Sequence, residues 1–378
     1  MIGDDFAELK LFITGPILLR DEVRKAGLLP EFGHRDAENP KRFEPIMRNL
    51  KTIAGNLEGY TPVIFNGSGT NVLEASIRSL VADYDKVLNV SVGAFGDLCH
   101  KLAVVNGKNA VQLKFSYGSA IDLEKLEEAL KEHKPNVVTF THNETSTGVI
   151  NDVVAVCEMI HAHGAESIID AVSIFGGAPT FIDECKPLMY CTSTQKSLGL
   201  PAGFGIGFVC EKAMQKAETV ANRGYTTDII AQMGKAKLNQ TLTTPNGTLA
   251  NQMCVQLDYI VNEETVEGRF KRHEDMRAIA HKWAETMDGY ELFAQEGFRS
   301  PSLTTFKTPA HMTIDKLKEV KELMRGHGYL FDPGYGKINK ELEEQGESPI
   351  FRVGHMADIQ PEMLAEYLEV LGRVLKQY

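Results

Sequence analysis

The sequence predicts an α/β protein with a large domain, in which helices flank a mostly parallel sheet, followed by a smaller α+β domain. Two patterns lead to this fold class. From about residue 60 to 210, short apolar runs alternate with segments of helical length, as in strands joined by crossover helices. After about residue 262, a charged helical stretch and a few short strands replace this alternation. A chain of 378 residues, 43% of them hydrophobic, is long enough for both domains and can build a full core.

The individual elements follow from the apolar patterns, taken in chain order. Strands of the large domain are expected at 62–66, 86–92, 137–142, 167–172, 188–192 and 204–210. Helices between them are expected at segments that include 70–81, 123–132 and 153–163. The smaller domain should contain a helical stretch at 263–287, strands at 303–307 and 351–353, and an amphipathic helix at 361–376. We therefore divide the chain into a large domain of residues 21–262 and a small domain of residues 263–378.

Composition excludes several classes of function. The formal net charge of −11 argues against a surface for nucleic acid or anionic membranes, because such surfaces need basic patches. The six cysteines are scattered without a C-x-x-C pair, so we expect reduced thiols and no metal site. No basic segment followed by an apolar run opens the chain, and no apolar stretch approaches the roughly 18 residues that span a bilayer. We therefore expect a cytoplasmic protein.

Three motifs follow strands of the predicted sheet, where α/β folds bind ligands. The first is Asn66-Gly67-Ser68-Gly69-Thr70, between a strand and a helix. Its glycines allow a sharp turn, and the N–H groups of the following helix, with the Ser68 and Thr70 hydroxyls, suit a phosphate. An ordinary tight turn with a helix cap is the alternative. The motif is not a Walker A loop, because no Gly-Lys-Ser/Thr follows.

The second motif is Asp170, at the end of an apolar run and followed by Ala-Val-Ser. A carboxylate at a buried strand end needs a cationic or hydrogen-bonding partner. Asp170 could cap a helix, hold a metal, or pair with a protonated ring nitrogen. The residue alone leaves these possibilities open.

The third motif is Lys196, in a loop rich in Ser and Thr that comes directly after a strand. Burial or a neighbouring cation lowers the pKa of an amine and makes it a good Schiff-base former. A solvated surface lysine is the alternative. The three motifs together are more informative, because pyridoxal phosphate needs an anion cradle, an acid partner for its ring nitrogen and a lysine.

At this point the sequence resembles the class V aminotransferases of fold type I, in the branch with serine–pyruvate, alanine–glyoxylate and archaeal aspartate aminotransferases. The resemblance begins at Ile13-Thr14-Gly15-Pro16 and extends to the C-terminal helix. Its strongest segments, in the family's order, are Gly33-His34-Arg35, Gly67-Ser68-Gly69-Thr70, His142-Asn143-Glu144-Thr145-Ser146-Thr147-Gly148, Asp170-Ala171-Val172-Ser173, Gln195-Lys196 and Phe351-Arg352-Val353-Gly354-His355-Met356.

The resemblance implies roles for the two residues expected to be catalytic. Lys196 matches the lysine that binds pyridoxal 5'-phosphate covalently and later moves a proton on it. Asp170 matches the aspartate that pairs with the pyridinium nitrogen and keeps the ring electron-withdrawing. The implied activity is a ping-pong transfer of an amino group from alanine, serine, aspartate or a related donor to a 2-oxo acid such as pyruvate or glyoxylate.

The resemblance also implies the surroundings of the cofactor and the substrate. Phe95 would stack on the cofactor ring, although many relatives carry Trp or Tyr there. Arg352 would clamp the substrate carboxylate, with Gly15, His34 and Arg35 nearby. The remaining cofactor contacts would come from Ser68, Gly69, Thr70, Thr145, Val172, Gln195 and Thr243.

The family architecture implies further features. The large domain should contain a seven-stranded sheet. Thr243 resembles a segment that a neighbouring subunit contributes, which implies a homodimer with shared active sites. The N-terminal segment, residues 1–20, is expected to pack on the partner subunit. The sequence departs from the family pattern near Gln240 and at residues 224–228, so side-chain specificity is open.

Other functions remain to be weighed. The pair His34-Arg35 suits an acidic donor, which favours a 2-aminoethylphosphonate or phosphoserine transaminase as the alternative; a structural ion pair explains it equally well. A desulfurase or lyase is less favoured, because Gln195 precedes the lysine where those relatives have His, and Cys191 lies in a predicted strand. A non-catalytic scaffold is disfavoured, because the lysine, the aspartate and the arginine are all present.

Overall fold

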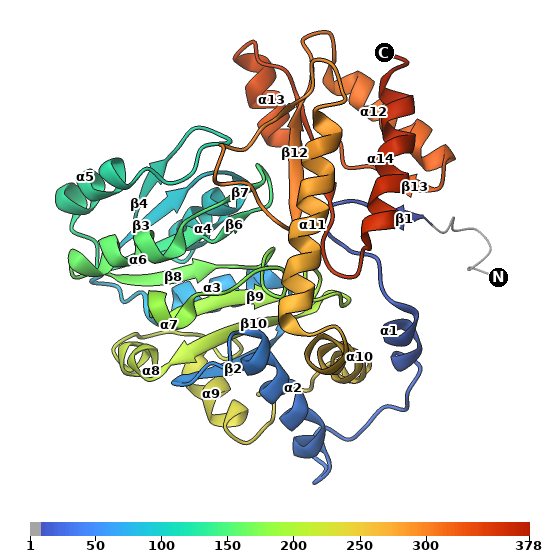
Figure 1. The fold of residues 1–378 in the computed structure, drawn as a ribbon. Helices are drawn as coiled ribbons and strands as arrows, with labels where there is room; N and C mark the ends of the chain where they lie inside the picture. The colour runs from blue at the N-terminus through green and yellow to red at the C-terminus, as the bar shows by residue number, and fades with distance from the viewer. Residues whose placement is uncertain (1–8) are drawn as a thin grey trace.

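The computed structural model describes residues 9–378, and its central feature is a seven-stranded sheet with helices on both faces (Figure 1). The strand order across the sheet is β2-β10-β9-β8-β5-β3-β4. The antiparallel strand is β10, which pairs with both β2 and β9; the other neighbours pair in parallel. The strands are β2 Tyr60–Gly67, β3 Lys86–Ser91, β4 Asn109–Lys114, β5 Val137–Thr141, β8 Glu166–Asp170, β9 Met189–Ser193 and β10 Gly203–Cys210.

Helices cover the sheet because its strands are apolar on both sides. Helices α3 and α4 pack on one face, against β9, β10, β3 and β5, while α6 packs on β8 and carries α5 (Figure 1). Their bounds are α3 Gly69–Leu80, α4 Ala94–Val105, α5 Leu123–His133 and α6 Val153–Ala162. The remaining helices of this part are α1 Asp21–Ala26, α2 Asn39–Ile53, α7 Ile182–Cys185, α8 Glu211–Glu218, α9 Ile229–Ala236 and α10 Gly247–Asp258.

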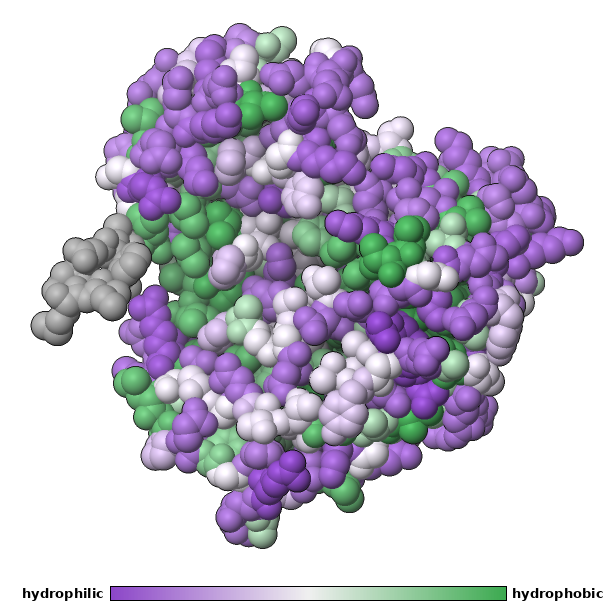
Figure 2. All heavy atoms as spheres, turned by 180° about the vertical axis from the view of Figure 1, so that it is seen from behind, coloured by the Kyte–Doolittle hydropathy of each residue, from purple (hydrophilic) through white to green (hydrophobic). Residues whose placement is uncertain are grey.

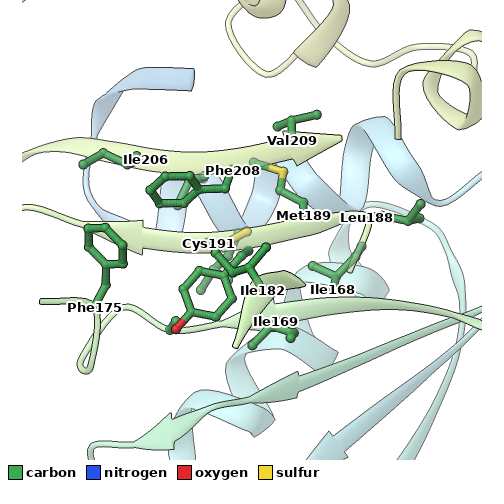
Figure 3. Packing of buried hydrophobic residues seen from close by; sticks show 14 of the residues in the cluster. Ile168, Ile169, Phe175, Ile182, Leu188, Met189, Cys191, Ile206, Phe208 and Val209 are labelled. Carbon is green, nitrogen blue, oxygen red and sulfur yellow. The ribbon is translucent and has the colours of Figure 1, made fainter. Parts of the chain in front are cut away.

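The core of the sheet is closely packed around its central strands. Side chains of β8, β9 and β10, among them Ile169, Met189 and Phe208, lie against one another in Figure 3. Phe175 contacts Phe208 with ring centroids 5.1 Å apart. This packing makes the strands rigid, so their carboxyl ends can hold functional groups in fixed positions.

The C-terminal part has its own hydrophobic cluster. The long helix α11, Val266–Ala284, leads into a three-stranded antiparallel sheet with the order β11-β12-β14. Its elements are β11 Glu291–Leu292, β12 Leu303–Lys307, α12 Ile314–Gly326, β13 Tyr329–Leu330, α13 Gly336–Glu344, β14 Ile350–Gly354 and α14 Pro361–Leu375. Before the C-terminal part, a small two-stranded antiparallel sheet of β6 Asn143–Glu144 and β7 Val149–Ile150 comes just after β5 in the chain.

The chain near its N-terminus lies on this C-terminal part. Strand β1, Lys10–Leu11, pairs in parallel with β13. The Phe12 ring stacks on Tyr367 at 4.1 Å, and the amide of Gly354 donates to the carbonyl of Phe12. Residues 10–14 therefore contact their own subunit. Of the segment expected to contact a partner, residues 1–8 lie outside the described part of the chain.

The predicted fold class and strands are confirmed, with small differences. The predicted strand at 167–172 ends earlier, at Asp170. The chain turns at this point, and the Val172 amide donates a hydrogen bond to the Asp170 side chain. The sequence prediction did not list β4, whose half-buried residues at the sheet edge give a weak apolar signal, nor helix α4. Within residues 9–378, no helix has the length and apolar character needed to cross a membrane.

Candidate active site

Three strand ends converge at one edge of the large sheet. Strand β2 ends at Gly67, β8 at Asp170 and β9 at Ser193. Strands β8 and β9 are parallel neighbours, and β2 runs in the same direction because β10 is antiparallel to both β9 and β2. The glycine turn, the carboxylate and the lysine loop therefore meet at the carboxyl edge, as the sequence predicted.

The glycine turn packs closely against the ends of β8 and β9. Ser68 immediately precedes α3, yet its side chain forms no cap hydrogen bond. A Cβ on Gly69 would lie 2.7 Å from a Val172 methyl and 3.2 Å from the Ser193 hydroxyl. Only a glycine fits between these side chains, so the turn, the β8 end and the β9 end are in direct contact. Thr70, in the first turn of α3, is exposed.

Asp170 is buried, and one of its oxygens accepts a 2.9 Å hydrogen bond from the Val172 amide. Burial, together with the nearby Glu144 carboxylate, raises the pKa of Asp170 to about 7. The Val172 amide and Lys196 act in the opposite direction. A carboxyl group with such a pKa can transfer a proton to a neighbouring group or form an ion pair with a cationic one.

Lys196 lies in the loop after β9, partly buried, with its ammonium donating to the Thr14 carbonyl. Burial, together with the positive charge of Arg352, lowers the pKa of Lys196 to about 8. Gly15 has a φ of +121°, and a Cβ there would lie 2.8 Å from the lysine nitrogen. Residues 14 and 15 thus form one wall around the amine, whose lowered pKa suits a nucleophile.

Arg352, on β14, reaches the same region from the C-terminal part. It is buried, and it donates to the carbonyl of Thr145 at 3.0 Å and to Asp332 at 3.1 Å. Its Nε atom is buried without a partner among the described residues. The guanidinium is therefore held in place with a donor left over, an arrangement suited to an anionic ligand.

Glu144 is a further buried group at this site. It lies in the segment 142–148 that resembles the family, but the sequence alone assigned no role to it. Its carboxylate accepts from the amides of Phe95 and Gly96, each at 3.1 Å, at the N-terminus of α4. It also accepts from Ser146. Burial raises the pKa of Glu144, opposed by these hydrogen bonds. Glu144 thereby sets the position of Phe95, whose ring meets Tyr335 edge-on at 6.1 Å.

Asp332 is the second group that sequence reasoning missed. It lies between β13 and α13 and carries no motif that would distinguish it from an ordinary turn aspartate. Its partners, Thr14 and Arg352, are distant in sequence from it and from each other. Only the folded chain brings the three together.

The remaining predicted residues lie farther out. The Thr243 hydroxyl accepts from Asn66 at 2.7 Å, which places it beside the glycine turn of its own chain. His34 is 3.3 Å from the Thr244 hydroxyl, and Arg35 is exposed. Among the described residues, neither His34 nor Arg35 forms a hydrogen bond or ion pair with Lys196, Asp170 or Arg352.

Comparisons with known proteins agree with this geometry. The family model Aminotransferase class-V matches residues 38–325. An uncharacterized aminotransferase of Methanocaldococcus jannaschii is 30% identical over 93% of this chain and 89% of its own length. A serine–glyoxylate aminotransferase of Methylorubrum extorquens is 29% identical, covering 92% of this chain and 86% of that protein.

A solved structure is similar over nearly the whole chain. The pyridoxamine–pyruvate aminotransferase from Mesorhizobium loti superimposes with a TM-score of 0.88 and 26% identity, covering 98% of this chain and 93% of that one. Its similarity extends over both the sheet and the C-terminal part. The match of the family model to most of the chain, together with these relatives, shows that the protein belongs to the class V aminotransferases and is a transaminase of fold type I.

Proposed function

We propose that this enzyme uses pyridoxal 5'-phosphate to move an amino group from alanine, serine, aspartate or a related amino acid to a 2-oxo acid such as pyruvate or glyoxylate. One observation carries the proposal: an amine with a lowered pKa, Lys196, lies at the same sheet edge as the buried Asp170 and the glycine turn before α3. The names of the relatives, which act on serine, pyridoxamine, glyoxylate and pyruvate, support the choice of substrates.

The residues at the sheet edge fit this cofactor. The Ser193 hydroxyl and the amide oxygen of Gln195 are buried without partners among the described residues. The Ser193 hydroxyl lies beside Gly69 at the N-terminus of α3, where a phosphate is favoured by the helix dipole. Gly69 lets the turn approach these residues closely, since a Cβ there would contact Val172 and Ser193. Ser68, Thr70 and Thr243 add hydroxyl groups around the turn.

Each side chain then has a definite task. When bound, pyridoxal phosphate supplies the carbonyl carbon and the electron sink for the reaction. The Lys196 nitrogen provides the nucleophile and afterwards holds or releases a proton, for which a pKa of about 8 is well matched. Asp170 supplies the negative partner of a ring nitrogen. Arg352 binds a substrate carboxylate, and Phe95 with Val172 provides apolar surface for a ring.

The proposal includes a homodimer with shared active sites. Large hydrophobic side chains are exposed on the single chain: Leu28 is 86% exposed, Tyr225 71% and Leu238 58%. Hydrophobic residues also show in the middle of the face in Figure 2, below a mostly hydrophilic upper region. Such surface is a typical subunit interface. Within this arrangement, we assign Thr243 and the segment 1–20 to contacts between subunits.

Two further assignments complete the proposal. We retain residues 21–262 as the large cofactor-binding domain and residues 263–378 as the small domain. We also place the enzyme in the cytoplasm, because all six cysteines are free thiols, which suits a reducing compartment.

An absorbance experiment tests the proposal. Protein purified with pyridoxal phosphate should show a visible band that an amino donor bleaches and a 2-oxo acid restores. A panel of donors against pyruvate, glyoxylate and 2-oxoglutarate then defines the substrates. Steady release of ammonia or sulfide without an oxo acid would instead indicate a lyase.

The lysine is tested by substitution. Lys196→Ala should abolish the band of lysine-bound cofactor and transamination, whereas Lys131→Ala, on the exposed face of α5, should behave as the wild type. Normal turnover of the Lys196→Ala protein would refute the mechanism.

A further inference from the structure

Asp332 lies beside the candidate site, between Thr14 and Arg352. It is only 6% exposed, and its backbone forms an isolated antiparallel bridge with Arg352 on β14. A buried carboxylate costs several kcal/mol of desolvation unless it is paired and hydrogen-bonded. The partners of the Asp332 carboxylate must offset this cost, so its contacts show which residues it holds in place.

Apart from a local hydrogen bond with Gly334, the contacts of this side chain are with Arg352 and Thr14, which both lie at the candidate site. One oxygen accepts from Arg352 Nη2 at 3.1 Å and from the Gly334 amide at 3.1 Å. The other accepts from the Thr14 hydroxyl at 3.1 Å and lies 3.1 Å from the guanidinium of Arg352. A single carboxylate thus joins the β14 arginine to the segment that follows β1.

Thr14 continues this connection to the amine. Its carbonyl accepts from the Lys196 ammonium, and the next residue, Gly15, lies against the end of the lysine side chain. The order of contacts is therefore Arg352 to Asp332, Asp332 to Thr14, and Thr14 to Lys196. The arginine and the lysine, on different parts of the chain, are held in register by one acidic residue.

The arginine has two fixed donors and one spare donor. Its Nη1 donates to Thr145, its Nη2 to Asp332, and its buried Nε has no partner among the described residues. A free guanidinium on a long side chain has many rotamers, whereas two anchors restrict it to one orientation. The anchors hold the spare donor ready for a ligand.

We propose that Asp332 is a positioning residue of the transaminase: it orients Arg352 for a substrate carboxylate and, through Thr14, holds the wall that contacts Lys196. This inference rests on the proposed function and goes beyond it, because Asp332 acts through Arg352 and Thr14. Its charge has a second effect. The Asp332 carboxylate raises the pKa of Lys196, whereas the Arg352 guanidinium lowers it.

Removing the Asp332 charge and removing the Arg352 charge should shift the pKa of the Lys196 nitrogen in opposite directions, which one spectroscopic measurement can show. The pH midpoint of the visible band of lysine-bound cofactor reports the proton affinity of the Lys196 nitrogen. Both Asp332→Asn and Asp332→Ala should lower this midpoint by about half a pH unit or more, because a negative charge near the nitrogen is lost. Arg352→Gln should raise it. Asp315→Ala, at an exposed position of α12, is the control and should leave it unchanged.

Steady-state kinetics tests the orientation of Arg352. Asp332→Ala should raise KM for the 2-oxo acid by about tenfold, as expected when a charge-assisted hydrogen bond is lost, with a smaller change in kcat. Asp332→Asn keeps an oxygen acceptor for Arg352 and Thr14, so its KM should rise less. This partial rescue by the conservative variant distinguishes positioning from general damage.

The outcomes separate this inference from the proposed function. If Asp332→Ala does not fold, the midpoint of the Asp332→Asn protein still decides the effect of the charge. Unchanged midpoints in the Asp332 variants, in an enzyme whose wild type transaminates normally, would overturn the role of Asp332 and leave the proposed function intact. Absence of the visible band in the wild type would overturn the proposed function itself.

Discussion

Arg269 donates from Nη2 to the carbonyl oxygen of Ser197, at 2.7 Å, and Ser197 directly follows Lys196 in the chain. Arg269 is fully buried on α11 and forms ion pairs with Glu264 at 2.6 Å and Asp358 at 2.8 Å. Gln256 joins the same group by donating to the Leu198 carbonyl and to Asp358. The loop that carries Lys196 is thus held by hydrogen bonds from Arg269 and Gln256 to its backbone carbonyls. Glu264 and Asp358 in turn hold Arg269 in place.

Arg269→Met tests this anchor. The substitution keeps an apolar stem but leaves Asp358 buried without its main cation, so we expect a loss of about 3 to 5 kcal/mol in the free energy of unfolding. Urea unfolding followed by circular dichroism measures the loss. The control is Arg373→Met, which breaks an exposed ion pair with Glu369 and should cost about 1 kcal/mol or less. Equal losses in the two variants would contradict the anchoring role.

Gly69→Ala tests the cradle before α3. The added Cβ would lie 2.7 Å from a Val172 methyl and must displace it, at a cost of about 1 to 3 kcal/mol in stability. Because the turn also faces the expected phosphate, affinity for pyridoxal phosphate should fall by about tenfold or more, measured by titrating the apoprotein. Gly234→Ala is the matched control.

Gly234 lies in helix α9, and nothing is within 4 Å of its Cβ position. The alanine there should stabilise the protein by about 0.5 to 1 kcal/mol and leave cofactor affinity unchanged. A Gly69→Ala protein that binds the cofactor as tightly as the wild type would show that the turn is not the phosphate site.

Glu144→Ala should loosen the start of α4. The variant loses the acceptor for the amides of Phe95 and Gly96, which then remain without their partner near the N-terminus of the helix. We expect weaker cofactor binding, by about tenfold, because Phe95 is no longer held in one position. Glu144→Gln retains an oxygen acceptor and should bind more tightly than Glu144→Ala. The measurement is the dissociation constant for pyridoxal phosphate; the same constant in both variants would argue against the capping role.

Asp170 makes the stability of the apoprotein depend on pH. Its pKa is raised from 3.8 in a flexible chain to about 7 in the fold, so the folded state binds more protons than the unfolded state in this window. Its contribution to stability is therefore present at low pH and is lost as pH rises towards 7. Asp170→Asn removes this loss.

The difference in unfolding free energy between the Asp170→Asn variant and the wild type should therefore grow by about 2 kcal/mol from pH 5 to pH 7 in the variant's favour. Urea unfolding of the two apoproteins at both pH values checks the sign. A difference that does not change with pH would mean that Asp170 is not desolvated in the absence of the cofactor.

Much of the fold could be predicted from the sequence because apolar periodicity reports burial directly. Strands β2, β5 and β10 are nearly continuous apolar runs, and the predicted ranges overlap them closely. Strand β4 was missed for the same reason: at the sheet edge, residues such as Gln112 and Lys114 are partly exposed, and the pattern resembles a loop. Lys196, Asp170 and the glycine turn could be singled out as candidates because each follows a predicted strand.

The sequence by itself determined most strands of the sheet, the order of the three motifs along it and the family to which the chain belongs. Only the tertiary structure decided which side chains support them: Glu144 at the start of α4, Asp332 between Arg352 and Thr14, and Arg269 under the lysine loop. The physical reason is that a strand or a glycine turn is specified by residues next to one another in the chain. A buried carboxylate is instead specified by its partners, and the partners of Asp332 are 318 residues away at Thr14 and 20 residues away at Arg352.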